Sequence, residues 1–370
     1  MKKVLSLLLV MMMAFGMLAG CGSETSDKPE TQGSQQEQKD TGKENKDTTG
    51  KPGETPAEKM LKEIEEELMT QLKPLPETGK GEKIGVLIIS LTNSFWANMK
   101  TCYEKAGEEL GIEVNVVTGT TEGDTTSQLE ALMTMASQDY DAIILSPIDG
   151  TNLIPGIVQC NQNGILVLNL GPGVDTNALK AAGGHLDGKI TVKFQDQGKM
   201  VADDMVKRLP DGGKVAILQG LSGAGQSEGR TEGAKAVFEA AKGIELVSVQ
   251  PCDWDATKAY DATKDLIQAN PDLKGIFACN DVMALAAMEA LKAEGKTDVL
   301  VYGVDFTADA ATSIKNGEMM GTMTYSSSIY TKAAELYALK LIQGQTVQGP
   351  VYSPLTLVTQ DNAADFDGWK

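Results

Sequence analysis

The chain from residue 83 onward predicts an α/β fold built from two doubly wound parallel-sheet lobes. Short apolar runs of strand length alternate there with stretches of helical length, beginning with the run 83–90 (KIGVLIIS) and the stretch 95–110. This alternation is typical of parallel strands that helices cover on both faces. It occurs in two series, one that ends near residue 169 and one that begins near residue 198, so we expect two lobes.

The individual elements follow from the same pattern. The expected strands of the first series are residues 83–90, 112–118, 142–146 and 165–169. The expected helices between them are residues 95–110, 126–138 and 152–163. The second series is expected to contain helices at residues 198–208, 226–241, 256–269 and 282–294. Its expected strands are residues 214–219, 245–250, 275–278 and 299–303. Ligands of such sheets bind at the carboxyl ends of the strands, so the residues that follow each strand are candidate site residues.

The first 21 residues have the pattern of an export signal that ends in a cysteine. A basic start, Met1-Lys2-Lys3, precedes the almost wholly apolar residues 4–18, and Leu-Ala-Gly stands before Cys21. The Leu-Ala-Gly-Cys ending resembles the bacterial lipobox, in which the cysteine thiol is diacylated. The apolar run is shorter than the roughly 20 residues that a membrane-spanning helix needs. We therefore expect a signal peptide over residues 1–20, lipidation of Cys21 and an extracytoplasmic protein anchored to the cell membrane.

A tether and a helix are expected between Cys21 and the lobes. Residues 21–54 are rich in Gly, Ser, Thr, Gln and charged residues and contain no aromatic residue, so they cannot bury enough apolar surface to fold. Residues 55–82 are expected to form an amphipathic helix and a linker, since Thr55 to Glu58 is a capping box with Pro56 at the first helical position. Apolar residues then recur at helical spacing: Leu61, Ile64, Leu68 and Leu72. Whether this helix packs on the lobes or on a partner stays open.

Composition excludes several classes of function. The chain has 33 basic and 51 acidic residues, which argues against nucleic-acid binding because phosphate backbones need a positive surface. Four cysteines lie within the lobes: Cys102, Cys160, Cys252 and Cys279. They form no CxxC pair and no histidine cluster accompanies them, so we expect no metal. Export permits disulfides, but wide spacing and apolar surroundings favour buried free thiols.

Signals for catalysis are weak. The loop at residues 220–225 follows a strand and precedes a helix, but it lacks the Gly-Lys-Ser/Thr ending of a phosphate loop. The single histidine, His185, is not accompanied by a nucleophile elbow. We therefore expect a protein that is not an enzyme and that needs no cofactor.

Aromatic, amide, carboxylate and guanidinium side chains follow the expected strands. They are Asn93, Phe95 and Trp96 after the first strand, and Arg230, Trp254, Asn280 and Asp305 in the second series. A sugar needs this mixture, because its C–H faces pack on aromatic rings and its hydroxyls pair with planar polar groups. Of the adjacent pair, we expect Asp281 to cap a helix and Asn280 to face the ligand. Phe194 is a further candidate, and Asp149 is equally suited to shaping its turn.

The order of these motifs resembles the type I periplasmic sugar-binding proteins, the ribose- and galactose-binding receptors of ABC transporters. The resemblance covers about residues 83–360 and depends on NSFW, ILSPIDG, GAGQSEGRTEGAKAVF, PCDWDATKAYD, GIFACNDVMALAAMEAL and VYGVDFTADA. It implies that Asn93, Phe95 and Trp96 of one lobe contact the sugar. It implies that the other lobe contributes Arg230, Trp254, Asn280 and Asp305, and that Tyr325 lies near the hinge.

The resemblance also implies a three-segment hinge and a transport partner. Crossings are expected near residues 192–194, 325–326 and 354–355. The first lobe would then comprise residues 83–193 plus 326–354, and the second would comprise residues 194–325 plus 355–370. The lobes would close around a small neutral polar ligand, most simply a monosaccharide, and an ABC-transporter permease would recognise the closed monomer.

Departures from the family pattern concern the pocket. Gly171-Pro172 stands where many members have an aspartate, so we expect the first lobe to lack a strong acceptor for sugar hydroxyls. Ser146 replaces an asparagine of some relatives, and Tyr325 is bulkier than the usual amide. A standard ribose or galactose site is therefore not expected. Two alternatives stay open: a sensory receptor that reports a sugar-like signal to a chemoreceptor or kinase, and a secreted enzyme that acts on small glycosides.

Overall fold

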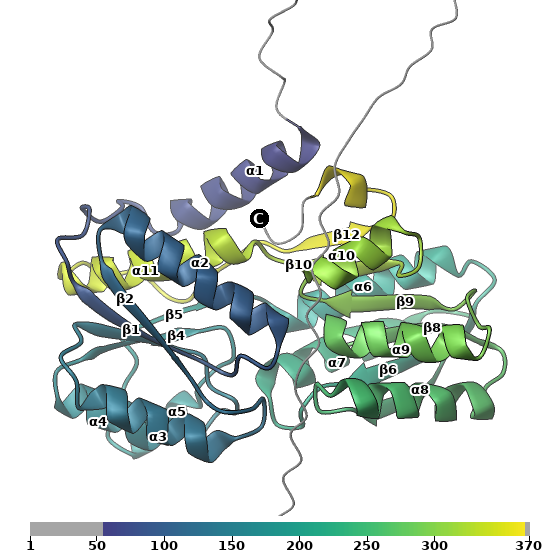
Figure 1. Ribbon diagram of the computed structural model, residues 1–370, viewed down its shortest axis with the longest axis horizontal. Helices are drawn as coiled ribbons and strands as arrows, with labels where there is room; N and C mark the ends of the chain where they lie inside the picture. The colour runs from purple at the N-terminus through teal and green to yellow at the C-terminus, as the bar shows by residue number, and fades with distance from the viewer. Residues whose placement is uncertain (1–54, 367–370) are drawn as a thin grey trace, which may run out of the picture. The chain divides into compact units, whose positions relative to one another are not determined.

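The computed structural model describes residues 55–366, which contain two six-stranded sheets (Figure 1). The strand order of the first sheet is β11 (Val351–Tyr352), β5 (Gly188–Thr191), β4 (Leu166–Leu170), β3 (Ala142–Leu145), β1 (Lys83–Ile88) and β2 (Glu113–Thr118). The strand order of the second sheet is β12 (Thr356–Thr359), β10 (Gly321–Thr324), β9 (Leu300–Val304), β8 (Leu273–Ala278), β6 (Gly213–Gln219) and β7 (Ile244–Pro251). Neighbouring strands pair in parallel, except that β12 runs antiparallel to β10. The predicted fold class is confirmed.

Helices cover both faces of the first sheet. They are α2 (Ser94–Leu110), α3 (Thr125–Ala136), α4 (Ile154–Gln162), α5 (Thr176–Ala181) and α11 (Ser327–Ile342). Alternate residues of β1 enter different cores: Val86 packs in the cluster with α2 and α11, whereas Leu87 packs in the cluster with α3 and α4. Figure 1 shows these two helix layers on opposite sides of the sheet. Burial on both faces is the reason that the central strands β1, β3 and β4 are almost wholly apolar.

The second sheet has its own helices and its own core. The helices are α6 (Phe194–Arg208), α7 (Gly225–Ala240), α8 (Ala256–Ala269), α9 (Asp281–Ala293) and α10 (Ala308–Lys315), and a short 3-10 helix η1 (Ala363–Asp365) follows β12. Phe238, Phe277 and Tyr302 are fully buried in this core. We call each sheet with its helices a lobe, the first lobe containing β1 and the second lobe containing β6.

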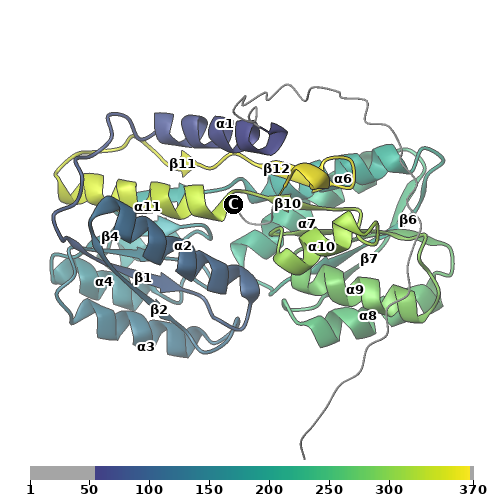
Figure 2. The ribbon, with the colours of Figure 1, turned by 45° about the horizontal axis from the view of Figure 1, so that its top comes forward.

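The chain passes from one sheet to the other at three places. These crossings are residues 192–193 between β5 and α6, residues 325–326 between β10 and α11, and residues 353–355 between β11 and β12. All three lie side by side between the lobes, as Figure 2 shows. Three short parallel connections are the usual basis of a hinge, because a few backbone angles in each can absorb a rotation of the lobes.

Helices α6 and α7 contact each other through their backbones. A Cβ atom at Gly198 of α6 would overlap the carbonyl oxygen of Arg230 on α7. A Cβ atom at Gly233 of α7 would overlap the carbonyl oxygen of Gln195 on α6. Only glycine permits this close approach. The contact matters for the site, because α7 carries Arg230.

The variant Gly198→Ala is expected to lower the free energy of unfolding by about 2 kcal/mol, because the added methyl group must push α6 and α7 apart. The net value already includes a gain of about 1 kcal/mol from the higher helix propensity of alanine, which offsets part of the steric cost. Chemical denaturation measures the change. The control is Lys199→Ala on the exposed face of the same helix, which is expected to change stability by less than about 0.5 kcal/mol. Equal stability of the two variants would contradict the close packing.

The predicted N-terminal helix is present as α1 (Pro56–Thr70) and begins as expected. The Thr55 hydroxyl accepts from the backbone N–H of Glu58 at 3.2 Å, and the Glu58 carboxylate accepts from the backbone N–H of Thr55 at 2.8 Å. This reciprocal pair is a capping box, and Pro56 occupies the first turn. The predicted capping signal is confirmed.

Helix α1 packs against both lobes. Leu68 and Leu72 are fully buried in the core of the first lobe, whereas Ala57, at the other end of the helix, packs in the core of the second lobe. The side-chain amide of Gln71 also forms two hydrogen bonds with the backbone of Tyr352, of 2.8 Å and 3.0 Å, next to the β11–β12 crossing. Helix α1 therefore lies across the hinge and contacts both lobes (Figure 2).

The predicted signal peptide (residues 1–20), the lipidated Cys21 and the tether (residues 21–54) lie outside the described residues. Within residues 55–366, no helix combines the length and the apolar character needed to cross a membrane.

Candidate ligand-binding site

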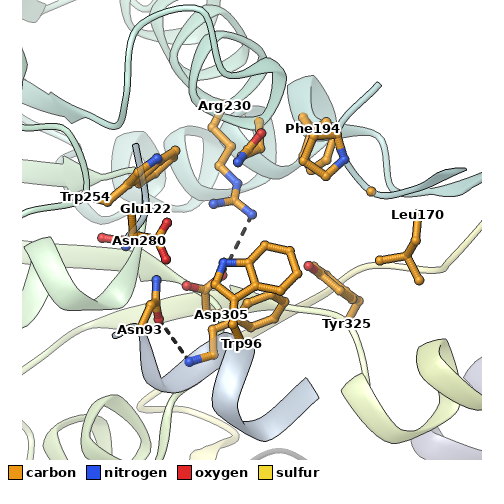
Figure 3. A pocket seen from close by; sticks show the side chains of 14 residues that line it. Asn93, Trp96, Glu122, Leu170, Phe194, Arg230, Trp254, Asn280, Asp305 and Tyr325 are labelled. Carbon is orange, nitrogen blue, oxygen red and sulfur yellow. Dashed lines mark hydrogen bonds and ion pairs between the residues drawn. The ribbon is translucent and has the colours of Figure 1, made fainter. Parts of the chain in front are cut away.

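One cavity lies between the lobes at the carboxyl ends of both sheets (Figure 3). Its enclosed volume is about 40 Å³, so the side chains of the two lobes approach one another closely around it. The eight residues named from the sequence all line it: Asn93, Phe95, Trp96, Arg230, Trp254, Asn280, Asp305 and Tyr325. The further candidate Phe194 lines the cavity as well. The remaining lining residues are Glu122, Leu170, Gly171, Pro172 and Gln226.

The first lobe contributes an aromatic wall at the start of α2. The side-chain oxygen of Asn93 accepts from the backbone N–H of Phe95 at 2.9 Å and so caps the helix. This cap fixes the two following rings, Phe95 and Trp96, which contact each other edge to face with centroids 4.9 Å apart. Phe95 also contacts the ring of Tyr325, 6.0 Å away, at the crossing between β10 and α11. The aromatic wall is thus continuous from α2 to the hinge.

Arg230 is the central polar group of the second lobe. Its Nε donates to the Gln197 side chain at 2.8 Å, and its Nη1 donates to the carbonyl oxygen of Cys279 at 2.7 Å. Its Nη2 lies 3.8 Å from a carboxylate oxygen of Asp305, and its guanidinium lies 5.7 Å from the centre of the Phe194 ring. Only 4% of the residue is exposed. The guanidinium is therefore held in one plane, which suits it to a bidentate contact with neighbouring hydroxyls.

Asp305 follows β9 in a backbone conformation with φ of 122°. Burial raises the pKa of its carboxyl well above the usual value, the nearby Arg230 guanidinium opposes this rise, and Asp281 and Glu122 add to it. The ion pair between Arg230 and Asp305 is buried, so the charge of each side chain offsets the desolvation cost of the other.

The structure corrects the expected roles of Asn280 and Asp281. Asn280, not Asp281, caps α9, since its side-chain oxygen accepts from the backbone N–H of Met283 at 3.0 Å. Asp281 is fully buried behind the cavity, where it accepts from the Thr307 backbone and the Thr322 hydroxyl, each at 2.7 Å. Burial raises the pKa of Asp281 to about 7. Asn280 nevertheless lines the cavity. The cap uses only its side-chain oxygen, so its amide nitrogen can donate to a ligand.

Trp254 is held by an unusual backbone. Trp254 has a φ of 64° and Asp253 a φ of 52°, both in the left-handed region that non-glycine residues rarely occupy. The indole ring lies against Gly220, where any Cβ atom would overlap it. Strained backbone of this kind persists where the surroundings fix it, and it clusters at ligand sites. The strain here places a large flat ring on one side of the cavity.

Two residues from the sequence analysis do not reach the cavity. Asp149 accepts from the backbone N–H groups of Thr151 and Asn152 at 2.7 Å and 2.8 Å, so it shapes its turn. Ser146 is buried but is not among the lining residues.

Glu122 and Gln226 are lining residues that the sequence analysis missed. Glu122 follows β2, so the rule that residues after strands form the site could have found it. Glu122 also overturns one expectation, because the first lobe does place a carboxylate at the cavity despite Gly171-Pro172. Burial raises the pKa of Glu122 to about 7.

Three polar atoms at the cavity have no hydrogen-bond partner among the described residues. They are Oε1 of Glu122, Oε1 of Gln226 and Nδ2 of Asn280, and all three are buried. Each such group costs about 1–3 kcal/mol when it stays unpaired. The cavity is therefore suited to a polar ligand that contacts both lobes. Among residues 55–366 no group of His, Cys, Asp and Glu is arranged to hold a metal ion, and the four cysteines there form no disulfide.

Two parallel α/β lobes that enclose one cavity of aromatic and polar side chains are the architecture of a two-lobed solute-binding protein. The sequence matches the family described as periplasmic binding protein domain over residues 84–346, and the chain belongs to this family. The resemblance drawn from the sequence motifs is thereby confirmed.

Relatives within the family are named for sugars. The D-allose-binding periplasmic protein of Escherichia coli (strain K12) is 34% identical over 240 residues, which cover 64% of this chain and 77% of the relative. The ribose import binding protein RbsB of Bacillus subtilis (strain 168) is 31% identical over 289 residues, which cover 78% of this chain and 91% of the relative.

A solved structure is similar over the same region. It is an ABC transporter periplasmic solute binding protein from Actinobacillus succinogenes 130z with bound D-allose, 28% identical, with a TM-score of 0.74. The match covers 77% of this chain and all of that one. These relatives are binding proteins, in agreement with the prediction that the chain is not an enzyme.

Proposed function

We propose that the chain is the solute receptor of an ABC transporter and that its lobes close around a neutral monosaccharide. The observation that carries the proposal is the buried Arg230–Asp305 pair, which faces the Trp96 and Trp254 rings across one cavity. Planar polar groups beside aromatic rings match the two faces of a sugar, its hydroxyls and its C–H groups. The three polar atoms without partners add acceptors and a donor for further hydroxyls.

The proposed contacts come from both lobes and from the hinge. They are Asn93, Phe95 and Trp96 on the first lobe, Arg230, Trp254, Asn280 and Asp305 on the second, and Tyr325 at the crossing. A ligand shifts an opening equilibrium only by its different affinity for the two states, and a ligand that touches both lobes favours the closed one. We assign residues 83–193 plus 326–354 to the first lobe and residues 194–325 plus 355–370 to the second.

The sugar we propose is an aldose of the allose and ribose type. The support is the naming of the relatives for D-allose and ribose and the D-allose bound in the similar structure. An ABC-transporter permease would recognise the closed form of a monomeric receptor. The receptor would be held at the cell membrane by a lipid on Cys21, which the Leu-Ala-Gly-Cys motif supports.

Thermal unfolding of the purified full chain against a panel of small molecules tests this function. The panel contains pentoses, hexoses, polyols, nucleosides and amino acids. A ligand present at about a thousand times its Kd adds about 4 kcal/mol to the stability of the folded state, which raises the Tm by several degrees. We expect D-allose or D-ribose to give the largest shift. A shift with nucleosides or amino acids alone would overturn the assignment to sugars.

A further inference from the structure

Glu122 is a carboxylate that faces the cavity from the first lobe. It lies between β2 and α3, and of the described lining residues on that lobe it is the one with an ionisable side chain. Asn93 forms a hydrogen bond with its carboxylate, and Oε1 has no partner within residues 55–366. Both Glu122 and Asn280, from different lobes, line the cavity (Figure 3). One of its oxygens is therefore free to accept from a ligand.

The loop that carries Glu122 is fixed at both ends. Asp124 caps α3 by accepting from the backbone N–H of Ser127 at 3.0 Å, and it accepts from the Thr120 hydroxyl at 2.6 Å. On its other side the loop meets the second lobe, since a Cβ atom at Gly123 would lie 3.9 Å from the Leu221 side chain. Glu122 is thus held at the line where the two lobes meet, and this is where a contact discriminates between open and closed forms.

The charges that face Glu122 come mainly from the second lobe. Arg230 on α7 supplies the positive charge, and Asp305 after β9 supplies a second carboxylate, behind which Asp281 is buried. The remaining ionisable residue that lines the cavity is Tyr325, at the crossing between β10 and α11. Since Arg230 already pairs with Asp305, the carboxylate of Glu122 is left without a cationic partner in the lining. A hydroxyl donor from a neutral ligand would offset its burial, whereas an anionic group would not.

We propose that Glu122, in its ionised form, accepts a hydrogen bond from a sugar hydroxyl, and that sugar binding therefore releases a proton. The inference rests on the proposed sugar-receptor function and adds a residue and a pH response to it. Burial holds the pKa of Glu122 at about 7 before the ligand arrives. A hydroxyl that donates to the carboxylate stabilises the charged form and lowers this pKa.

The sign of the pH effect follows from this change. Below about pH 7 the carboxyl must lose its proton before it can accept, so the Kd is larger at low pH. As the pH rises through about 7, the affinity increases and then levels off. Asp305 has a raised pKa as well, so the wild-type curve alone cannot assign the proton to one carboxyl. A variant of Glu122 is needed to separate the two.

Calorimetric titration of the full chain with D-allose and D-ribose, at about pH 6 and about pH 8, tests the proposal. Repeating each titration in two buffers of different ionisation enthalpy gives the number of protons released. We expect Glu122→Gln to weaken binding roughly tenfold to a hundredfold at the higher pH and to abolish most of the proton release. Glu122→Asp, which keeps the charge on a shorter side chain, should bind more weakly but still release a proton.

Controls separate this inference from the proposed function. Glu130→Gln changes an exposed glutamate on α3 and should leave affinity and proton release unchanged. If the wild type binds neither sugar, the proposed function is overturned, and the role of Glu122 with it. If the wild type binds and Glu122→Gln releases as many protons with the same affinity, the role of Glu122 alone is overturned. The ligand-free Tm of each variant shows that it is folded.

Discussion

Replacing Arg230 by alanine is expected to weaken sugar binding by more than a hundredfold and to destabilise the ligand-free protein by about 3 kcal/mol. The first effect follows from the loss of the planar donor that we place against the sugar. The second follows from the contacts of the guanidinium. Its removal takes the hydrogen-bond donor from Gln197 and from the carbonyl of Cys279, and the ion-pair partner from the carboxylate of Asp305. Calorimetric titration and chemical denaturation measure the two effects separately.

Two further variants show which property of Arg230 matters. Arg230→Lys keeps the charge but loses the planar fork, so it should recover much of the stability and little of the affinity. Lys235→Ala, an exposed position on the same helix, should change neither quantity by more than about 0.5 kcal/mol. Sugar affinity equal to that of the wild type in Arg230→Ala would refute the assignment of the site.

Trp254→Ala is expected to weaken sugar binding about a hundredfold, because it removes the flat ring on one side of the cavity. The ring also packs in the core of the second lobe, so stability should fall by about 3 kcal/mol. The same titration and denaturation experiments measure both losses. Trp254→Phe, which keeps a smaller ring, should retain part of the affinity.

A glycine variant tests the position of the ring without removing it. A Cβ atom at Gly220 would overlap the indole of Trp254, so Gly220→Ala should displace the ring and also weaken binding. If Gly220→Ala and Trp254→Ala both bind sugar like the wild type, Trp254 is not part of the ligand site. The proposed sandwich of the sugar between aromatic rings would then have to be abandoned.

The sequence predicted most clearly the strands that are continuous runs of apolar residues. Strand β3 (AIIL) is fully buried, and such an apolar run is visible without any structure. Strands β5 (GKIT) and β10 (GTMT) are short and contain glycine and threonine, so their composition gives little signal. Helix α11 was missed for the opposite reason. It is buried around most of its surface, including Glu335, and so shows no single apolar stripe.

Element ends were predicted where a side chain marks them. The capping box formed by Thr55 and Glu58 marks the start of α1. Helix α6 begins at Phe194, four residues before the expected start, and the Lys193 side chain forms no capping hydrogen bond with any described residue. Without such a cap, the sequence shows no point at which the helix must begin.

The candidate site could be located from the sequence because parallel strands bring their carboxyl ends to one edge. That rule collected seven residues that line one cavity, and the family resemblance added Tyr325. The contact of these residues with a ligand stays a prediction. The rule could not decide which of Asn280 and Asp281 caps α9, because either side chain can cap a helix. The choice depends on Thr307 and Thr322, which hold Asp281 behind the cavity and are distant in the sequence.

The position of α1 bears on where a mechanical load would enter the protein. The Gln71 end of the helix lies beside the β11–β12 crossing, whereas Ala57 at its other end packs in the core of the second lobe. A force that reaches the helix through Thr55 would therefore pass first to the second lobe. Because α1 also packs on the first lobe through Leu68, a rotation of the lobes must change at least one of these two contacts.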